Sequence, residues 1–197
     1  KIILKLNSRV LKRRTMVIRI GKSRMEFPLC YRGIGRWLSI YRSREPDQLY
    51  ILSKTLREGD SVLEIGSNIG YYVIKEAELL HGKGTIFAYE PDARNVEFLK
   101  RNISMNGLSD IVEVSEVAVS NRNCDQELYI CDASNQSALG KSSLGRTYID
   151  KQQVKVVALD TILKQIGTTV DLMRMDLEGH ELDVFQSLID FIKNEGD

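Results

Sequence analysis

One stretch of the chain combines glycine and carboxylate residues in a spacing that suits a nucleoside-containing cofactor. Residues 61–70 read Ser-Val-Leu-Glu-Ile-Gly-Ser-Asn-Ile-Gly, and Glu90-Pro91 follows twenty residues after Gly70. Glycine allows backbone to turn tightly and to approach a ligand, and a carboxylate at the end of the next strand can accept both hydroxyl protons of a ribose. The simpler alternative is that the glycines only turn the chain and that Glu90 caps the next segment. We predict a cofactor site made of Glu64, Gly66, Ser67, Asn68, Gly70, Tyr71, Glu90, Pro91, Ala118 and Asp176.

Glu64 narrows the choice of cofactor. A dinucleotide site has the pattern G-x-G-x-x-G, which lets a pyrophosphate lie on a helix N-terminus. Here Glu64 occupies the position of the first glycine. A carboxylate would repel a pyrophosphate, but it would attract a cofactor with a cationic amino-acid end, directly or through water. The pattern therefore predicts S-adenosylmethionine and disfavours the alternative, a nicotinamide-dependent oxidoreductase.

The elements around this motif alternate between strands and helices. The apolar run Val62, Leu63 and Ile65 is typical of a strand buried on both faces of a parallel sheet. Helical spacing follows it at 71–80, and a second strand is expected at 85–89, so the segment forms one βαβ unit. The same reading continues with a helix at 92–105, strands at 111–119, 154–158 and 171–175, and a helix at 182–193.

Several motifs together resemble the FkbM-type class I methyltransferases. They include Glu64-Ile-Gly-Ser-Asn-Ile-Gly-Tyr-Tyr72, Tyr89-Glu-Pro91, Val157-Ala-Leu-Asp160 and Arg174-Met-Asp-Leu-Glu-Gly-His-Glu181. The resemblance runs from about Glu45 to the C-terminus. It implies a Rossmann-like α/β sandwich with a mostly parallel sheet and helices on both faces. The implied activity is methyl transfer from S-adenosylmethionine to oxygen, commonly a hydroxyl of a sugar, glycolipid or secondary metabolite. Two positions depart from the family pattern: Arg174 replaces a usual lysine and His180 a small residue.

Candidate catalytic residues follow the strand expected at 171–175. Ligands bind beyond the carboxyl ends of parallel strands, so Asp176, Glu178 and His180 should face the cofactor cleft. Methyl transfer to a hydroxyl requires mainly that the acceptor be positioned and its proton removed. Asp176 or His180 could be that base, although Asp176 could instead orient the cofactor and Glu178 could cap a helix. A divalent metal held by Asp176, Glu178 and Asp160 is conceivable, but no spacing demands one, so we predict none.

Charge divides the chain into two regions. Residues 1–58 contain fifteen Lys or Arg against four Asp or Glu, whereas residues 59–197 contain thirteen against twenty-three. We therefore expect a basic N-terminal appendage at 1–58, with a hairpin at 15–29 and a helix before Gly59, and a methyltransferase domain at 59–197. The appendage either packs against the acidic domain or binds an anionic partner. A non-catalytic module that binds cofactor or a polyanion is the third functional alternative.

The remaining expectations concern the acceptor, the chain end and the compartment. The polar stretch 134–153 is predicted to be a substrate lid. Strands expected after the last helix are missing, so we expect a truncated domain or a homo-oligomer that covers the open sheet edge. The three cysteines form no C-x-x-C pair, and no apolar run is long enough to span a membrane. The cysteine pattern favours a cytoplasmic protein. The acceptor implied by the resemblance is a hydroxyl of a small molecule or glycan.

Overall fold

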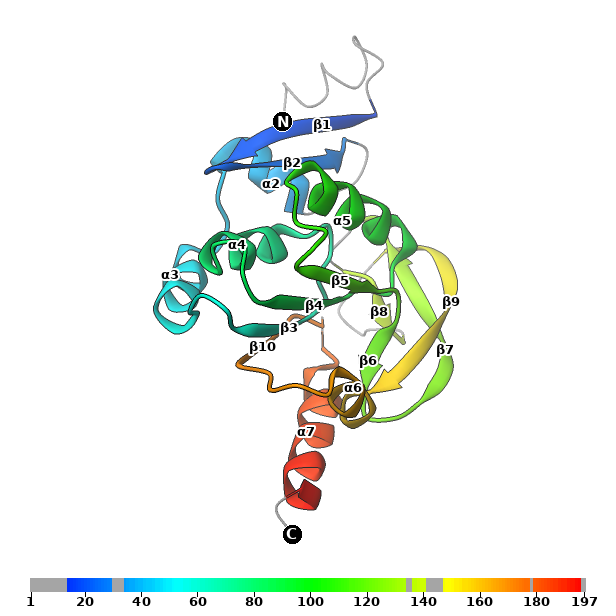
Figure 1. Ribbon diagram of the computed structural model, residues 1–197. Helices are drawn as coiled ribbons and strands as arrows, with labels where there is room; N and C mark the ends of the chain where they lie inside the picture. The colour runs from blue at the N-terminus through cyan, green and yellow to red at the C-terminus, as the bar shows by residue number, and fades with distance from the viewer. Residues whose placement is uncertain (1–13, 30–33, 134–135, 141–146, 178, 196–197) are drawn as a thin grey trace.

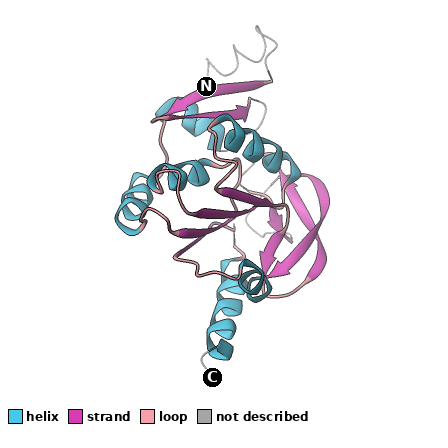
Figure 2. Ribbon diagram, viewed as in Figure 1, coloured by secondary structure: helices cyan, strands magenta, loops and turns pink. Residues whose placement is uncertain are grey.

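The chain folds into an α/β sandwich with a hairpin at one end and a small second sheet at one side (Figures 1 and 2). The computed structural model describes residues 14–29, 34–133, 136–140, 147–177 and 179–195. The central sheet has the strand order β10-β3-β4-β5, and every neighbouring pair is parallel. Its strands are β3 (Ser61–Ile65), β4 (Thr85–Tyr89), β5 (Val112–Ser115) and β10 (Leu172–Met175). The predicted α/β fold class is confirmed.

Alternating side chains of β3 explain why helices cover both faces of this sheet. Val62 packs in one core with α4 (Tyr71–Leu79) and α5 (Ala93–Met105). Leu63 and Ile65 point the other way, into a second core with α6 (Leu159–Ile166) and α7 (Glu181–Glu195). Glu64 shares the α4 side with Val62, because successive side chains in a strand point to opposite faces. The helices predicted at 71–80, 92–105 and 182–193 are therefore confirmed, whereas α6 had not been predicted.

The second sheet corrects two predictions. Its strands are β6 (Ala118–Ser120), β7 (Cys124–Cys131), β8 (Ala138–Leu139) and β9 (Tyr148–Ala158), in the order β6-β9-β7-β8. The single strand predicted at 111–119 was wrong, because the chain leaves the central sheet after Ser115 and β6 pairs with β9 instead. The mostly polar stretch 134–153, predicted to be a lid, is not a continuous loop: it contains β8, and residues 148–153 pair with β7 along an antiparallel ladder. Residues 134–135 and 141–146 lie outside the described residues.

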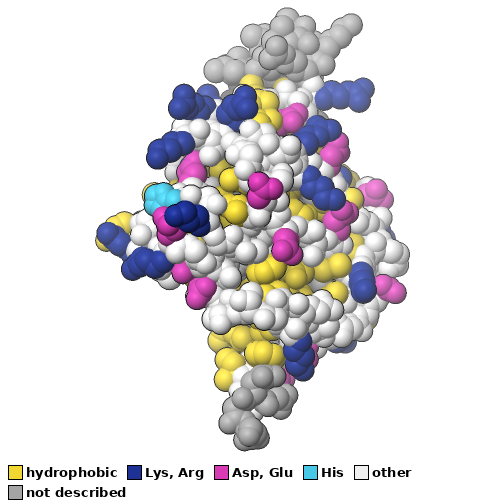
Figure 3. Space-filling model, viewed as in Figure 1, with side chains coloured by type: hydrophobic (Ala, Val, Ile, Leu, Met, Phe, Trp, Pro, Cys, Tyr) yellow, Lys and Arg dark blue, Asp and Glu magenta, His cyan; other side chains and the backbone are white. Residues whose placement is uncertain are grey.

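The N-terminal region shares a core with the rest of the chain. Its elements are β1 (Thr15–Ile20), β2 (Ser23–Pro28), α2 (Ile34–Tyr41) and α3 (Pro46–Thr55). The predicted hairpin and the helix before Gly59 are confirmed, and α2 is additional. Met25, Phe27 and Leu38 are buried in the same cluster as Ile74 and Leu99. Figure 3 shows basic side chains gathered over the hairpin end of the molecule.

Asn102 of α5 joins the hairpin to the loop after β3. Its side chain is fully buried and accepts a hydrogen bond from the Glu26 amide at 2.7 Å. Its Nδ2 donates to the Glu26 carbonyl at 3.0 Å and to the Ile69 carbonyl at 2.8 Å. A single amide thus satisfies backbone groups of two segments that are distant in sequence.

The opposite end of the molecule exposes apolar side chains. Among the described strands, β10 pairs only with β3 and forms an edge of the central sheet. Leu182, Phe185 and Ile192 are exposed on α7, which projects from the body of the molecule (Figure 1). Within the part of the chain that the structure describes, none of the helices is long and apolar enough to cross a membrane.

Asn102→Ala should destabilise the protein by roughly 2–4 kcal/mol, because buried backbone groups of Glu26 and Ile69 would lose their partners. Asn106→Ala is the matched control, since Asn106 makes a similar pair of bonds to Arg24 at a more exposed position. We expect about 1 kcal/mol or less for the control. Urea denaturation measures both values, and equal losses would contradict the role assigned to Asn102.

Candidate cofactor site and active site

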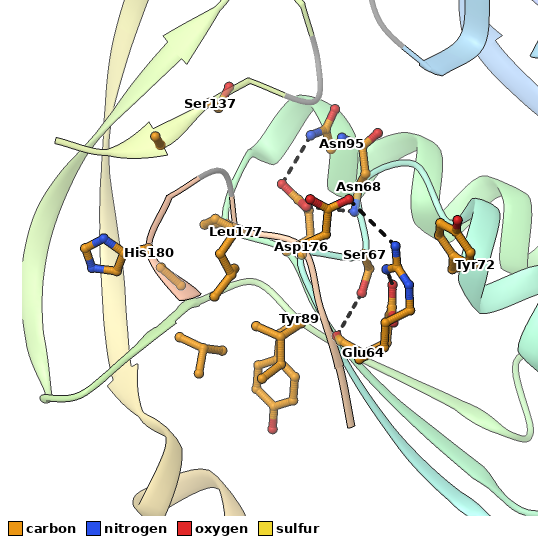
Figure 4. Close-up of a pocket in the computed structure, with 18 of the residues that line it drawn as sticks. Glu64, Ser67, Asn68, Tyr72, Tyr89, Asn95, Ser137, Asp176, Leu177 and His180 are labelled. Carbon is orange, nitrogen blue, oxygen red and sulfur yellow. Dashed lines mark hydrogen bonds and ion pairs between the residues drawn. The ribbon is translucent and has the colours of Figure 1, made fainter. Parts of the chain in front are cut away.

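The carboxyl ends of β3, β4 and β10 converge on one cleft. The cleft holds about 860 Å³ of open space, part of it continuous with solvent. Its walls come from the loop after β3, the residues after β4 and β10, the segment Val117–Val119, and β8. Ile34 and Arg44 from the N-terminal region also border it. Figure 4 shows how the labelled side chains from these elements surround the space.

The loop after β3 is held against β4 by backbone hydrogen bonds. The amides of Gly66 and Ser67 donate to the Tyr89 carbonyl at 2.9 and 3.0 Å. Gly66 has φ of 84°, and a Cβ there would lie 2.3 Å from the Asp176 carbonyl oxygen. The missing side chain of Gly66 therefore makes room for the chain after β10, which brings Asp176 beside the loop.

Glu90 is a buried carboxylate surrounded by donors. It accepts hydrogen bonds from the Asn68 amide at 2.8 Å, the Asp92 amide at 3.0 Å and Asn95 Nδ2 at 3.2 Å. Burial raises the pKa of Glu90 to about 7, and these hydrogen bonds offset only part of the effect. Its position at the end of β4, facing the cleft, is the one the sequence predicted.

Glu64 is paired with Arg174, which the sequence did not predict. The Nη1 of Arg174 lies 2.6 Å from Glu64 Oε1, and the guanidinium stacks on the Tyr72 ring with Cζ 3.4 Å from the centroid. Glu64 is almost completely buried, and its Oε2 has no hydrogen-bond partner. Desolvation, together with the nearby Glu76, raises the pKa of Glu64 well above its ordinary value, and Arg174 opposes that rise. The sequence feature that could have indicated this ion pair was Arg174 itself, a basic residue two positions before Asp176 in a strand predicted to be buried.

Asp176 and His180 both border the cleft, on different sides of Leu177 (Figure 4). Asp176 is half-exposed, and its Oδ2 lies 3.7 Å from Arg174 Nη2. His180 Nε2 lies 3.3 Å from Asp183 Oδ2, and Asp183 Oδ1 accepts a hydrogen bond from Asn121 Nδ2 at 3.3 Å. This carboxylate–imidazole pair had not been predicted, although Asp183 follows His180 at helical spacing.

The structure brings most of the predicted site residues together. All described candidates border the cleft except Gly70, whose missing side chain instead makes room for Leu99. Glu178 lies outside the described residues. Asp160 lies in the first turn of α6 and does not border the cleft. Among the described residues, no group of three or more His, Cys, Asp or Glu side chains is placed to hold a metal ion. Cleft residues that were not among the predicted site residues are Ile34, Arg44, Ile65, Tyr72, Tyr89, Asn95, Val117, Val119, Leu128, Ser137, Ala138, Leu139, Arg174 and Leu177.

The family follows from a comparison of the chain with models of known protein families. Residues 64–195 match the model described as the methyltransferase FkbM domain. The chain belongs to the FkbM methyltransferase family. Membership assigns S-adenosylmethionine as the cofactor, in agreement with the prediction from Glu64 and Glu90.

Individual relatives share shorter segments with this FkbM family member. Protein-L-isoaspartate O-methyltransferase 1 of Archaeoglobus fulgidus is 37% identical over 59 residues, which are 30% of this chain and 27% of that protein. Ribosomal protein L11 methyltransferase of Bacillus cereus is 34% identical over 65 residues, 33% of this chain and 20% of that protein. The chain thus spans about a quarter or less of the length of these curated relatives. The crystal structure of methyltransferase FkbM from Methylobacillus flagellatus KT aligns with 80% of this chain and 39% of its own, at 17% identity and a TM-score of 0.49.

The cleft has the chemistry that this cofactor needs. Glu90 offers carboxylate oxygens to ribose hydroxyls, and the unpartnered Oε2 of Glu64 is a buried acceptor beside the cleft. Arg174 adds a guanidinium at the same end. Acceptors for hydroxyl and ammonium groups, and a donor for a carboxylate, are therefore all present.

Glu90→Gln should remove one source of pH-dependent stability. A carboxyl whose pKa is raised on folding stabilises the protein at low pH, and this contribution disappears as pH rises from about 4.5 to about 7. The unfolding free energy of the wild type should therefore fall relative to Glu90→Gln across that range, by up to roughly 3 kcal/mol. Denaturant unfolding of both proteins at a series of pH values measures the difference. If the curves of wild type and Glu90→Gln ran parallel over this range, the raised pKa of Glu90 would be contradicted.

Proposed function

We propose that the protein transfers the methyl group of S-adenosylmethionine to a hydroxyl of a small molecule or glycan, such as a sugar, glycolipid or secondary metabolite. The observation that carries the proposal is the position of Glu90 and Asp176 at the ends of two parallel strands that border one cleft, in a member of the FkbM family. The sequence after β10 favours oxygen as the acceptor atom. Enzymes that methylate exocyclic amino groups of bases commonly carry an Asn/Asp-Pro-Pro-aromatic segment there, and here Asp176 is followed by Leu-Glu-Gly.

Three parts of the cleft would hold the cofactor. Glu90 would accept the ribose hydroxyls. Glu64 and Arg174 would bind the ammonium and the carboxylate of the amino-acid end, because the guanidinium fork suits a carboxylate. Val117, Ala118 and Leu139 offer apolar surface for the adenine ring. When bound, the sulfonium supplies an electrophilic methyl carbon to an acceptor held in line with it.

His180 is the residue we propose as the proton acceptor. In a neutral imidazole whose Nε2–H donates to Asp183, the lone pair of Nδ1 is free to take a proton. Asp183 would orient the ring in the way a carboxylate orients a catalytic histidine. Asp176, beside Arg174, would then position the cofactor or the acceptor hydroxyl rather than remove its proton.

Cofactor binding followed by turnover tests the proposed activity. Calorimetry should show saturable binding of S-adenosylmethionine and S-adenosylhomocysteine but not of NAD. Glu90→Ala should weaken binding at least tenfold, because buried ribose hydroxyls would lose their acceptor. Transfer of a labelled methyl group to a panel of hydroxylated small molecules and glycans would then identify the acceptor class.

Each negative outcome points to a different alternative. Preference for NAD would support a nicotinamide-dependent oxidoreductase and overturn the proposal. Saturable binding without transfer to any acceptor of the panel would favour a cofactor-binding module over an enzyme.

His180→Asn should lower kcat by a factor of roughly 100 or more, because loss of a general base typically costs that much, and should leave cofactor affinity within about twofold. His81→Asn is the matched control, since the other histidine of the chain does not border the cleft. Asp183→Asn should lower kcat less than His180→Asn. Steady-state kinetics measure these effects, and a near-normal kcat for His180→Asn would move the role of base to another group.

A further inference from the structure

A further buried carboxylate, which the proposed function does not use, lies behind the cofactor cleft. Glu76 of α4 is completely buried, although it does not border the cleft itself. Both side-chain oxygens of Glu76, and Oε2 of Glu64, have no conventional hydrogen-bond partner. The two carboxyl groups interact: Glu76 raises the pKa of Glu64, and Glu64, as a potential hydrogen-bond partner, lowers the pKa of Glu76. Both face the α4 side of β3, and the charge of Arg174 acts on both. The cluster therefore contains two buried carboxyl groups and one guanidinium.

The charges of this cluster do not balance unless it carries a proton. Arg174 can neutralise one carboxylate, and a second ionised carboxylate would leave a net negative charge buried at a high desolvation cost. A single proton between Glu64 and Glu76 removes that charge and supplies a hydrogen bond to the oxygens that lack partners.

The neighbouring charged groups do not remove this imbalance. Asp176 approaches Arg174 from the chain after β10, and Glu45 accepts a hydrogen bond from the Tyr72 hydroxyl. Arg44 is committed to Glu45 at 2.6 Å. Besides Arg174, these surrounding groups contribute two carboxylates and one guanidinium, so they add no positive charge that could balance the pair.

We propose that Glu64 and Glu76 share one proton in the cofactor-free protein and that this proton leaves when the ammonium of the cofactor binds at Glu64. This inference rests on the proposed function, because it takes S-adenosylmethionine as the ligand. Glu76 is then a positioning residue that acts through Glu64. Before binding, the shared proton prevents an excess negative charge on the two carboxylates beside Arg174, and after binding the ammonium of the cofactor takes over that role. The released proton goes to solvent.

The proposal predicts the sign of a pH effect on affinity. Burial raises the pKa of Glu76 to about 7 and that of Glu64 well above its ordinary value, so the pair holds its proton in slightly acidic solution. Release of one proton makes the dissociation constant fall about tenfold for each unit by which pH rises, up to that range. Above it the affinity should no longer depend on this pair.

The test counts protons released on binding at pH 6, by calorimetry in two buffers with different ionisation enthalpies. Wild type should release about one proton more than Glu76→Gln when S-adenosylmethionine binds, because the amide of Gln replaces the shared proton. With 5′-methylthioadenosine, which has the ribose but no amino-acid end, the two proteins should release equal numbers. Any proton that Glu90 loses to the ribose contact is present in both proteins and cancels. Glu78→Gln, two residues farther along α4 and paired with Lys75, should behave as wild type.

A measurement on the cofactor-free protein separates this inference from the proposed function. The infrared spectrum of the wild type at pH 6 should contain an additional band of a protonated carboxyl group that Glu76→Gln lacks, whereas Glu90, whose pKa is also raised to about 7, contributes to both spectra. If the two spectra match, or if both proteins release equal numbers of protons with S-adenosylmethionine, the shared proton is overturned while the proposed function stands. If the band is present but S-adenosylmethionine does not bind, the proposed function fails and the expulsion of the proton fails with it.

Discussion

The ion pair between Glu64 and Arg174 is the interaction on which the candidate cofactor cleft depends. A carboxylate in the middle of a buried strand needs a cation beside it, and the parallel pairing of β3 with β10 places Arg174 opposite Glu64. The same register brings the Asp176 amide to the Ile65 carbonyl at 3.0 Å. Gly66 then has to lack a side chain, because the Asp176 carbonyl occupies the space of its Cβ. The register of β3 and β10, the glycine at position 66 and the buried ion pair therefore fit together at one end of the cleft.

The N-terminal region is part of this arrangement rather than a separate attachment to it. The Tyr71 hydroxyl at the start of α4 accepts a hydrogen bond from the Arg44 amide at 2.9 Å, and Ile34 and Arg44 border the cleft. Asn102 of α5 connects the hairpin to Ile69 in the loop that follows β3. The N-terminal region is thus linked, through Tyr71 and through Asn102, to the segment that borders the cleft.

Local patterns predicted the central elements well, and long-range pairing explains where they failed. The strand at 85–89 and the helix at 92–105 have strong apolar periodicity, and both were predicted within one residue. Residues 148–153 are polar, and their strand exists because β7 lies alongside, which no local pattern reveals. The position of Glu90 could be predicted from its spacing after the glycines. The partners of Glu64 could not be predicted, because Arg174 is 110 residues away in the sequence and Glu76 resembles an ordinary glutamate on a helix surface. The three-residue spacing of His180 and Asp183 is compatible with a contact along a helix. Predicting that contact required knowing that the helix begins at residue 181, directly after His180.

The central claim is that one cleft, defined by Glu90 at one end and by Glu64 with Arg174 at the other, holds the cofactor. A crystal structure of the protein with S-adenosylhomocysteine tests it most directly. We expect the ribose hydroxyls within hydrogen-bond distance of Glu90 and the amino-acid end beside Glu64 and Arg174. A ligand bound elsewhere, or one bound in the cleft with its ribose away from Glu90, would contradict the account.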